Sequence, residues 1–281
     1  MAGVYSGALA GGCWVDKVLR NMESGFRHLL KYRDLFLVFI WREFSIRYKQ
    51  SVFGVLWAII QPFSMMLLFT FIFSYVMPVK VAAYPYPIFF YSALLPWTFF
   101  ASSLNYAVPS LVSHYNLITK IYFPKEILPL SGIAVAFIDL LIASSIFVAM
   151  MIFYKIPLTF QALWSLALLL LLLLFTISVS LILSALNVYY RDVKLAIGFL
   201  IQLWFFATPI FYTIDRVPPK FKIILFLNPL TFIVENMRRC LIEGRAVIWW
   251  QYLIMLIFVI CIFWLGFKFF RVTEKRFADV I

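Results

Sequence analysis

The chain has 281 residues, of which 65% are hydrophobic and 13% are charged, against roughly 45–50% and about 25% in ordinary soluble domains. This composition excludes a soluble globular protein, and the length is better counted in membrane spans of about 20 residues each. The net charge of +12 does not point to nucleic acid, because the basic residues gather at the ends of apolar runs, where lipid head groups are the expected anionic partner. A transmembrane β-barrel is also excluded, since stretches such as residues 166–175 are apolar on every side.

The N-terminal part divides into a Gly-containing leader, residues 1–30, and a segment over residues 31–50 with two stripes at helical spacing. Its aromatic and aliphatic stripe consists of Phe36, Leu37, Ile40, Trp41, Phe44 and Tyr48. Arg42, Ser45 and Lys49 recur on the opposite face. The pattern predicts an amphipathic helix that lies in the head-group plane on the cytoplasmic side, with a plain membrane anchor as the simpler interpretation. Arg47 falls toward the apolar stripe, where it could reach lipid head groups or face a polar ligand.

The remainder, residues 51–281, reads as a transmembrane domain. Six apolar runs with charged or Pro-rich borders cover about residues 52–77, 86–109, 127–154, 162–186, 195–213 and 248–270. The predicted fold class is therefore an all-α, polytopic integral membrane protein with six transmembrane helices.

The distribution of Lys and Arg sets the expected orientation. With an even number of spans both termini lie on one side, and that side collects more basic residues than the opposite side. Most of the opposing basic residues lie in one long connection, where charge bias has less influence. We expect both termini in the cytoplasm.

That long connection, about residues 212–247, contains two short apolar runs, residues 223–227 and 230–234, separated by Asn228 and Pro229. Runs this short cannot span a bilayer, so they predict re-entrant or interfacial helices before the last span. A small surface domain is the alternative.

One carboxylate, Asp139, falls near the middle of the third run. An ionisable group at that depth is costly and is a functional candidate by default. It either couples transport to an ion or proton, or bonds a neighbouring helix for structural reasons, with the hydroxyls of Ser144 and Ser145 as weaker partners.

Enzyme chemistry is not indicated. The sequence has no G-x-x-x-x-G-K-[ST] phosphate loop, so the chain does not hydrolyse ATP by itself. The two histidines are far apart, and Cys13, Cys240 and Cys261 have no metal-ligand spacing. We expect no catalytic residue and no metal site.

Four segments resemble the membrane subunits of ABC exporters for O-antigen, capsular polysaccharide and teichoic acid. They are REFSIRYKQSVFGVLWAIIQP (residues 42–62), NLITKIYFPKEILPL (116–130), LNVYYRDVKLAIGFLIQLWFFATPIFY (186–212) and NPLTFIVENMRR (228–239). The resemblance runs in order from about residue 30 onward and is nearest to the O-antigen branch.

The resemblance implies a pore-forming subunit of the bacterial inner membrane that exports undecaprenyl-linked polysaccharide. It also implies a homodimer with two copies of a separate cytoplasmic ATPase, which binds ATP and Mg, so that this chain holds no cofactor itself. Capsular polysaccharide or teichoic acid is the alternative substrate within the same family.

The resemblance assigns residues 113–126 to the region that couples the membrane subunit to the ATPase. Its candidate contacts are Lys120, Tyr122, Phe123, Pro124, Lys125 and Glu126. An aromatic knob beside a rigid Pro turn suits a groove on a partner, whereas a plain connecting loop is the alternative. Arg191 and Asp192 resemble a second cytoplasmic turn, where they either pair with each other or touch the ATPase.

Two further groups of residues follow from the same resemblance. Arg42, Arg47 and Lys49 lie where a pyrophosphate head group would enter, and binding to anionic lipid is an equal alternative. The candidate channel aromatics, on which a glycan could slide, are Trp57, Phe69, Trp97, Phe100 and Trp204. The simpler interpretation of these rings is an interfacial belt or lipid-facing bulk.

Two other classes of function stay open. A secondary transporter or lipid scramblase would use Asp139 and need no ATPase. A membrane anchor for a glycan-assembly enzyme would not depend on the turn at Phe123 and Pro124.

Overall fold

A computed structural model describes residues 32–49, 51–77, 84–214 and 217–277. Within these ranges the regular structure is helical and contains no strand, which confirms the all-α class. The helices are α2 (Arg33–Tyr48), η1 (Gly54–Leu56), α3 (Trp57–Phe71), η2 (Ile72–Val76), α4 (Tyr86–Ser113), α5 (Tyr115–Lys120), α6 (Ile127–Phe153), η3 (Phe160–Leu163), α7 (Trp164–Tyr189), α8 (Asp192–Ala207), α9 (Pro219–Leu227), α10 (Pro229–Leu241) and α11 (Trp249–Glu274). The predicted leader, residues 1–30, lies outside the described residues.

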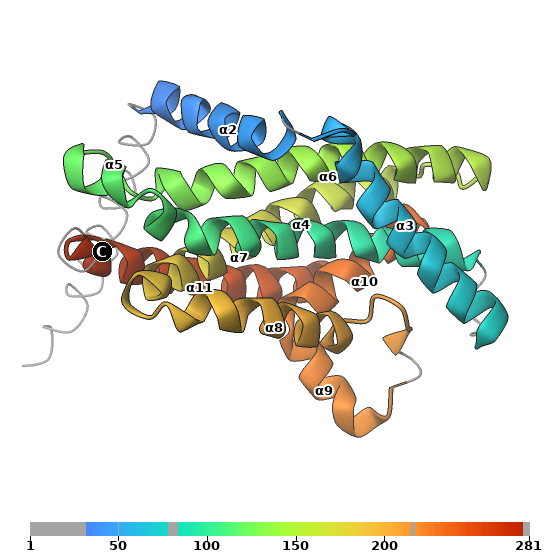
Figure 1. Ribbon diagram of the computed structural model, residues 1–281. Helices are drawn as coiled ribbons and strands as arrows, with labels where there is room; N and C mark the ends of the chain where they lie inside the picture. The colour runs from blue at the N-terminus through green and yellow to red at the C-terminus, as the bar shows by residue number, and fades with distance from the viewer. Residues whose placement is uncertain (1–31, 50, 78–83, 215–216, 278–281) are drawn as a thin grey trace, which may run out of the picture.

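The long helices form a bundle around α4 (Figure 1). Helix α4 is the most buried of them and packs against α6 and α7, while α11 packs chiefly on the far side of α7. Helices α3 and α8 also contact α4 but leave many of their apolar side chains exposed. The bundle therefore has a buried centre and two sparsely covered outer helices.

Two glycines permit the closest helix contacts. A Cβ atom on Gly132 of α6 would meet the Tyr106 Cβ of α4 at 3.0 Å, and one on Gly266 of α11 would meet the Ser178 carbonyl of α7 at 2.9 Å. Small residues at such points let helix backbones approach each other. They set the α4–α6 and α7–α11 spacings.

Among the described residues, five helices are long and apolar enough to cross a membrane: Gly54–Val76, Tyr86–Ser113, Ile127–Phe153, Phe160–Tyr189 and Trp249–Glu274. They correspond to five of the six predicted runs. The remaining run, 195–213, lies on α8, which has 16 residues and is about 24 Å long at 1.5 Å per residue. The helix ends at Ala207, because the chain turns at Thr208 and Pro209. The fifth of the six predicted spans is therefore not confirmed by length.

The predicted N-terminal helix is present as α2, but its packing differs from the prediction. Figure 1 shows α2 running lengthwise beside the first half of α6, and its placement in the head-group plane is not confirmed. Leu37 and Trp41 of the predicted apolar stripe are exposed, whereas Phe39, which was not assigned to the stripe, is buried. Residue spacing alone did not identify the packed face, because both faces of this helix carry apolar side chains.

The two short apolar runs before the last span become separate helices, α9 and α10, divided at Asn228 and Pro229. The Asn228 side chain accepts a hydrogen bond from the Leu230 N–H at 3.1 Å and so caps α10. Helix α10 is buried against α4 and α7, while α9 is mostly exposed. The re-entrant or interfacial placement of α9 and α10 stays a prediction.

The buried apolar residues separate into two clusters. The larger fills the centre of the bundle, and the smaller, which we call the end cluster, consists of Phe39, Leu111, Ile118, Phe123, Ile127, Leu128, Leu181, Ala185, Val188, Phe270 and Phe277. The end cluster lies where α5, the α7–α8 turn and the end of α11 meet (Figure 1). This end of the bundle holds the residues that the sequence assigned to partner contacts.

Candidate functional site

The segment between α5 and α6 divides into an exposed half and a buried half. Tyr122 is 88% exposed and Ile121 is 56% exposed, and Lys120 is also exposed. Phe123 and Pro124 are buried instead, and the Phe123 ring stacks on Phe39 of α2 with 6.0 Å between centroids. The aromatic side chain that can reach a partner is therefore Tyr122, while Phe123 belongs to the end cluster.

Lys125 and Glu126 also point into the molecule and hold the end of α11. The Lys125 ammonium group donates to the Glu274 carbonyl oxygen at 3.0 Å, and the Lys125 N–H donates to the Glu274 carboxylate at 3.2 Å. Glu126 is 1% exposed and lies 2.7 Å from the Arg271 guanidinium. Burial, with a smaller effect from Glu274, raises the pKa of the Glu126 carboxyl.

The second predicted turn lies at the same end. Arg191 and Asp192 are both exposed at the start of α8, and the ion pairs of the described residues do not include one between them. The turn is held by Asn187, which donates to the Val108 carbonyl at 3.2 Å and accepts from the Lys194 N–H at 3.1 Å. The side chains of Arg191 and Asp192 are thus available to a partner.

Arg47 and Asp139, assigned to separate roles from the sequence, are in direct contact. Arg47 forms an ion pair with Asp139, and the Tyr48 hydroxyl donates to the other carboxylate oxygen. The Arg47 guanidinium also lies 4.4 Å from the centroid of the Tyr106 ring on α4. Ser144 and Ser145 are not partners, since their hydroxyls bond carbonyl oxygens of their own helix.

A cavity of about 110 Å³ adjoins this pair between α2, α4 and α6. It is lined by Glu43, Ile46, Arg47, Tyr106, Gly132 and Val135. Arg42 and Lys49, the other two cations assigned to the head group, are exposed. Arg47 is therefore neutralised inside the chain, whereas Arg42 and Lys49 face outward.

A second polar contact joins α2 to the end of α4. The His114 Nε2 atom lies 3.2 Å from a Glu43 carboxylate oxygen, and its Nδ1 atom lies 2.8 Å from the Ser110 carbonyl oxygen. Both ring nitrogens therefore face oxygen atoms, one of α2 and one of α4. The hydrogen bond from His114 lowers the pKa of the Glu43 carboxyl.

The candidate channel aromatics differ in exposure. Trp97 and Phe100 are buried in the larger cluster, and the Phe100 ring lies 6.0 Å from Trp97 and 5.0 Å from Trp204 between centroids. Trp204 is partly buried and donates from its indole nitrogen to the Asn228 side chain at 3.1 Å, and Phe69 stacks on Phe90 at 4.7 Å. Trp57, at 46%, is the exposed one of the five candidates.

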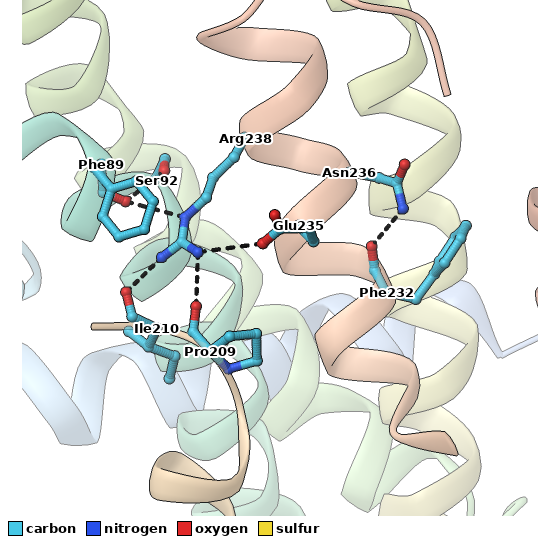
Figure 2. Close-up of polar contacts among 8 residues, drawn as sticks. All are labelled: Phe89, Ser92, Pro209, Ile210, Phe232, Glu235, Asn236 and Arg238. Atoms are coloured by element: carbon cyan, nitrogen blue, oxygen red, sulfur yellow. Dashed lines mark hydrogen bonds and ion pairs between the residues drawn. The ribbon is translucent and has the colours of Figure 1, made fainter. Parts of the chain in front are cut away.

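Arg238 of α10 is a buried cation that the sequence analysis did not single out. Its guanidinium donates to the carbonyl oxygens of Phe89 (3.3 Å), Pro209 (2.7 Å) and Ile210, lies 3.4 Å from Glu235, and stacks 3.7 Å from the centroid of the Phe89 ring (Figure 2). Burial lowers its pKa to about 10, which leaves it protonated at neutral pH. It joins α10, α4 and the turn after α8. The spacing of Glu235 and Arg238, three apart on one helix, was the available sequence signal.

No group of three or more His, Cys, Asp or Glu side chains within the described ranges could hold a metal ion. Cys240 is buried and Cys261 is exposed, both as free thiols, and Cys13 lies outside the described residues. The polar clusters join helices to one another and contain no nucleophile with an adjacent base.

Comparisons with known proteins identify the family of the chain. Residues 34–242 match the family described as ABC-2 type transporter. The chain is 31% identical over 252 residues to an O-antigen export system permease protein RfbA of Klebsiella pneumoniae, covering 88% of this chain and 95% of the relative. It is 26% identical to the protein of the same name from Myxococcus xanthus, with 91% and 98% covered, and 24% identical to the polysialic acid transport protein KpsM of Escherichia coli, with 83% and 91% covered. This multi-pass membrane protein therefore belongs to the ABC-2 type transporter family.

Proposed function

We propose that the chain is the transmembrane subunit of an ABC transporter that exports undecaprenyl-linked polysaccharide of the O-antigen type. The observation that carries the proposal is the similarity to O-antigen export permeases over almost their whole length. The identity to polysialic acid transport proteins is lower, so O-antigen is favoured over capsular polysaccharide, with teichoic acid a further member of the same class.

The proposed topology has six spans in the bacterial inner membrane and both termini in the cytoplasm. Helix α8 serves as the fifth span, with the turn after Ala207 completing the crossing. Helices α9 and α10 form a re-entrant pair on the outer side, and α2 lies within the cytoplasmic half of the protein. This topology is supported by the five long apolar helices and by the excess of basic residues at the end that holds α5 and the end of α11.

The proposed ATPase-docking surface lies at that same end. It consists of the exposed residues Lys120, Ile121 and Tyr122 together with Arg191 and Asp192 of the second turn. Lys125 and Glu126 act behind this surface, because both are engaged with α11. The ATPase, which binds ATP and Mg, supplies the energy.

The subunit is proposed to work as a homodimer with two ATPase copies. The exposed apolar faces of α3 and α8 support this, and the two helices meet where the Phe69 and Phe205 rings lie 5.9 Å apart. A glycan path between two copies would expose Trp57 of α3 to the substrate. Arg42 and Lys49, free of ion pairs within the described residues, would meet the pyrophosphate head group.

A secondary transporter that uses Asp139 is a weaker candidate. The Asp139 carboxylate is held by both Arg47 and Tyr48, and a group that binds and releases a coupling ion would have to break both contacts. The contacts support a structural link between α2 and α6.

The test is export of lipid-linked glycan by proteoliposomes that contain this chain alone or with its cognate ATPase. We expect export only with the ATPase and ATP, and none with an ATPase that cannot hydrolyse ATP. Tyr122→Asp should weaken ATPase binding, and Lys220→Asp, at an exposed position of α9 away from the docking surface, serves as the control. Export by the chain alone, unaffected by Tyr122→Asp, would overturn the proposal.

A further inference from the structure

Two hydrogen bonds and one ion pair join the segment before α6 to the last turns of α11. The Lys125 ammonium donates to the Glu274 carbonyl oxygen at 3.0 Å, and the Lys125 backbone N–H donates to the Glu274 carboxylate at 3.2 Å. Glu126 forms an ion pair with Arg271 at 2.7 Å. We call these four residues the joint. In the sequence, Phe123 and Pro124 connect Lys125 to the exposed residues 120–122, which are the proposed contact with the ATPase.

The burial of Glu126 makes this connection stiff. The carboxylate is 1% exposed, and neither of its oxygens receives a well-directed hydrogen bond within the described part of the chain. Arg271 is the cation in contact with it. A buried charge that loses its partner is strongly unfavourable, so the segment and α11 cannot separate without a large cost.

Apolar contacts reinforce the joint. Phe270 and Phe277 are fully buried in the end cluster on either side of Glu274, and the Lys125 ammonium lies 5.6 Å from the centroid of the Phe277 ring. The Tyr189 hydroxyl donates to the Thr273 carbonyl at 3.3 Å, which adds the end of α7. The end of α11 is therefore attached at several points.

The rest of α11 packs along one face, mainly against α7 and closely at Gly266. Of the residues of α11, Val259, Gly266 and Phe270 are buried. A helix fixed at one end and held along one face can tilt as a rigid body when its fixed end is displaced.

We propose that Glu126 and Arg271 are positioning residues that transmit displacement of residues 120–122 to α11, so that the last span moves whenever the docking surface moves. This inference rests on the proposed function, because it takes the ATPase as the source of the displacement. It assigns the joint a role in energy coupling in addition to its role in stability.

The test uses the full chain reconstituted with its cognate ATPase and compares Glu126→Gln, Arg271→Gln and Arg276→Gln. Gln keeps the size of Glu126 and removes its buried charge, and Arg271, whose side chain is 38% exposed, can then be solvated, so Glu126→Gln should still fold. Arg276 is exposed at the same end of the molecule and is the matched control. The readout is glycan exported per ATP hydrolysed.

We expect Glu126→Gln and Arg271→Gln to lower that ratio about fivefold or more, which is the range of typical coupling effects, while Arg276→Gln keeps the native ratio. A variant that is as stable as the native chain but exports less glycan per ATP shows that the joint transmits movement in addition to supporting the fold. Arg271→Lys keeps the charge and should restore most of the coupling. If Arg271→Gln does not fold, the comparison of Glu126→Gln with Arg276→Gln carries the test.

A second readout does not depend on transport. Spin labels at Leu170 of α7 and Ile257 of α11, both exposed, report the distance between the two helices. In the native complex ATP should change this distance, and in Glu126→Gln it should not. Native coupling and native movement in both variants would overturn the inference. A complex that exports no glycan even with native residues would instead overturn the proposed function.

Discussion

Arg47 and Asp139 form a charged pair between two helices, and each residue neutralises the other at a partly buried position. The side chains are 21% and 12% exposed. In such a pair the loss of one member leaves an uncompensated charge, whereas replacement of both by apolar residues removes the need for pairing. The pair therefore holds α2 against α6 only when both charged residues are present.

We predict that Arg47→Met and Asp139→Leu each lower the free energy of unfolding by about 3 kcal/mol, and that the double variant with both substitutions lowers it by less than the sum of the two effects. Thermal or denaturant unfolding in detergent measures this. Lys49→Met, at an exposed cation of the same segment, is the control. Additive losses would contradict a direct pair.

The stabilising effect of the Glu43 contact with His114 should depend on pH. Hydrogen bonding to His114 lowers the pKa of Glu43 from its usual value of 4.5. A carboxyl group with a lowered pKa stabilises the folded state above its unfolded pKa, and this contribution is lost as the pH falls through the folded pKa.

The unfolding temperature of the native chain should therefore fall as the pH decreases below about 4.5. Glu43→Gln should be less stable than the native chain at neutral pH and should show a flatter profile on the acid side. Unfolding scans at a series of pH values measure both profiles. Identical acid limbs would show that the Glu43 contact adds nothing to stability.

At the scale of the helix, close packing at Gly266 determines how near α11 lies to α7. A Cβ at this position would come within 2.9 Å of a carbonyl oxygen that is fixed in the backbone of α7. By contrast, Gly198 of α8 has no neighbouring atom within 4 Å of the same point. The two glycines are a natural pair for comparison.

We predict that Gly266→Ala destabilises the protein by about 1–3 kcal/mol, because the helices must move apart. Gly198→Ala should be neutral or should stabilise by up to about 1 kcal/mol, because alanine is the better helix former. Equilibrium unfolding of both variants against the native chain tests this. Equal effects of the two substitutions would be the contradicting result.

The sequence predicted the helices better than it predicted their exposed faces. Apolar runs and their charged borders located α2, the five long helices and the break at Asn228 and Pro229. The fifth apolar run, about residues 195–213, extends beyond its helix. Helix α8 stops at Ala207, although residues 208–212 remain largely apolar. Hydropathy does not register a turn whose residues are themselves apolar.

The candidate site could be predicted only in part for a related reason. Residues 120–126 were identified together, yet the chain exposes Tyr122 and buries Phe123. The burial of Phe123 depends on Phe39, a residue on α2 that lies far away in the sequence. Arg238 was overlooked because three of its partners are backbone carbonyls of α4 and the turn after α8, and backbone acceptors leave no pattern in a sequence.

At the scale of the whole molecule, the proposed docking residues and α9 lie at different places on the bundle. The docking residues and the end cluster share one end, whereas α9, with exposed apolar side chains, projects from the side of the bundle (Figure 1). The proposed topology puts the docking end in the cytoplasm and α9 toward the outer face of the inner membrane.

Sided labelling of single cysteines tests that arrangement. In a background without the native cysteines, Tyr122→Cys should react with a membrane-impermeant maleimide only when the cytoplasmic face is open to the reagent. Phe221→Cys on α9, which is exposed, should react from the outer face. Labelling of both positions from one side would contradict the six-span topology.

The end cluster also constrains the order in which the chain can assemble. Its members run from Phe39 on the first described helix to Phe277 beyond the last one. During synthesis the central bundle can form step by step, but the end cluster stays open until residue 277 has left the ribosome and entered the fold. Contacts between residues this far apart in sequence form late and slowly. The proposed docking surface is thus completed only once residue 277 has joined the fold, so a chain that stops before it would insert into the membrane without presenting the proposed site for the ATPase.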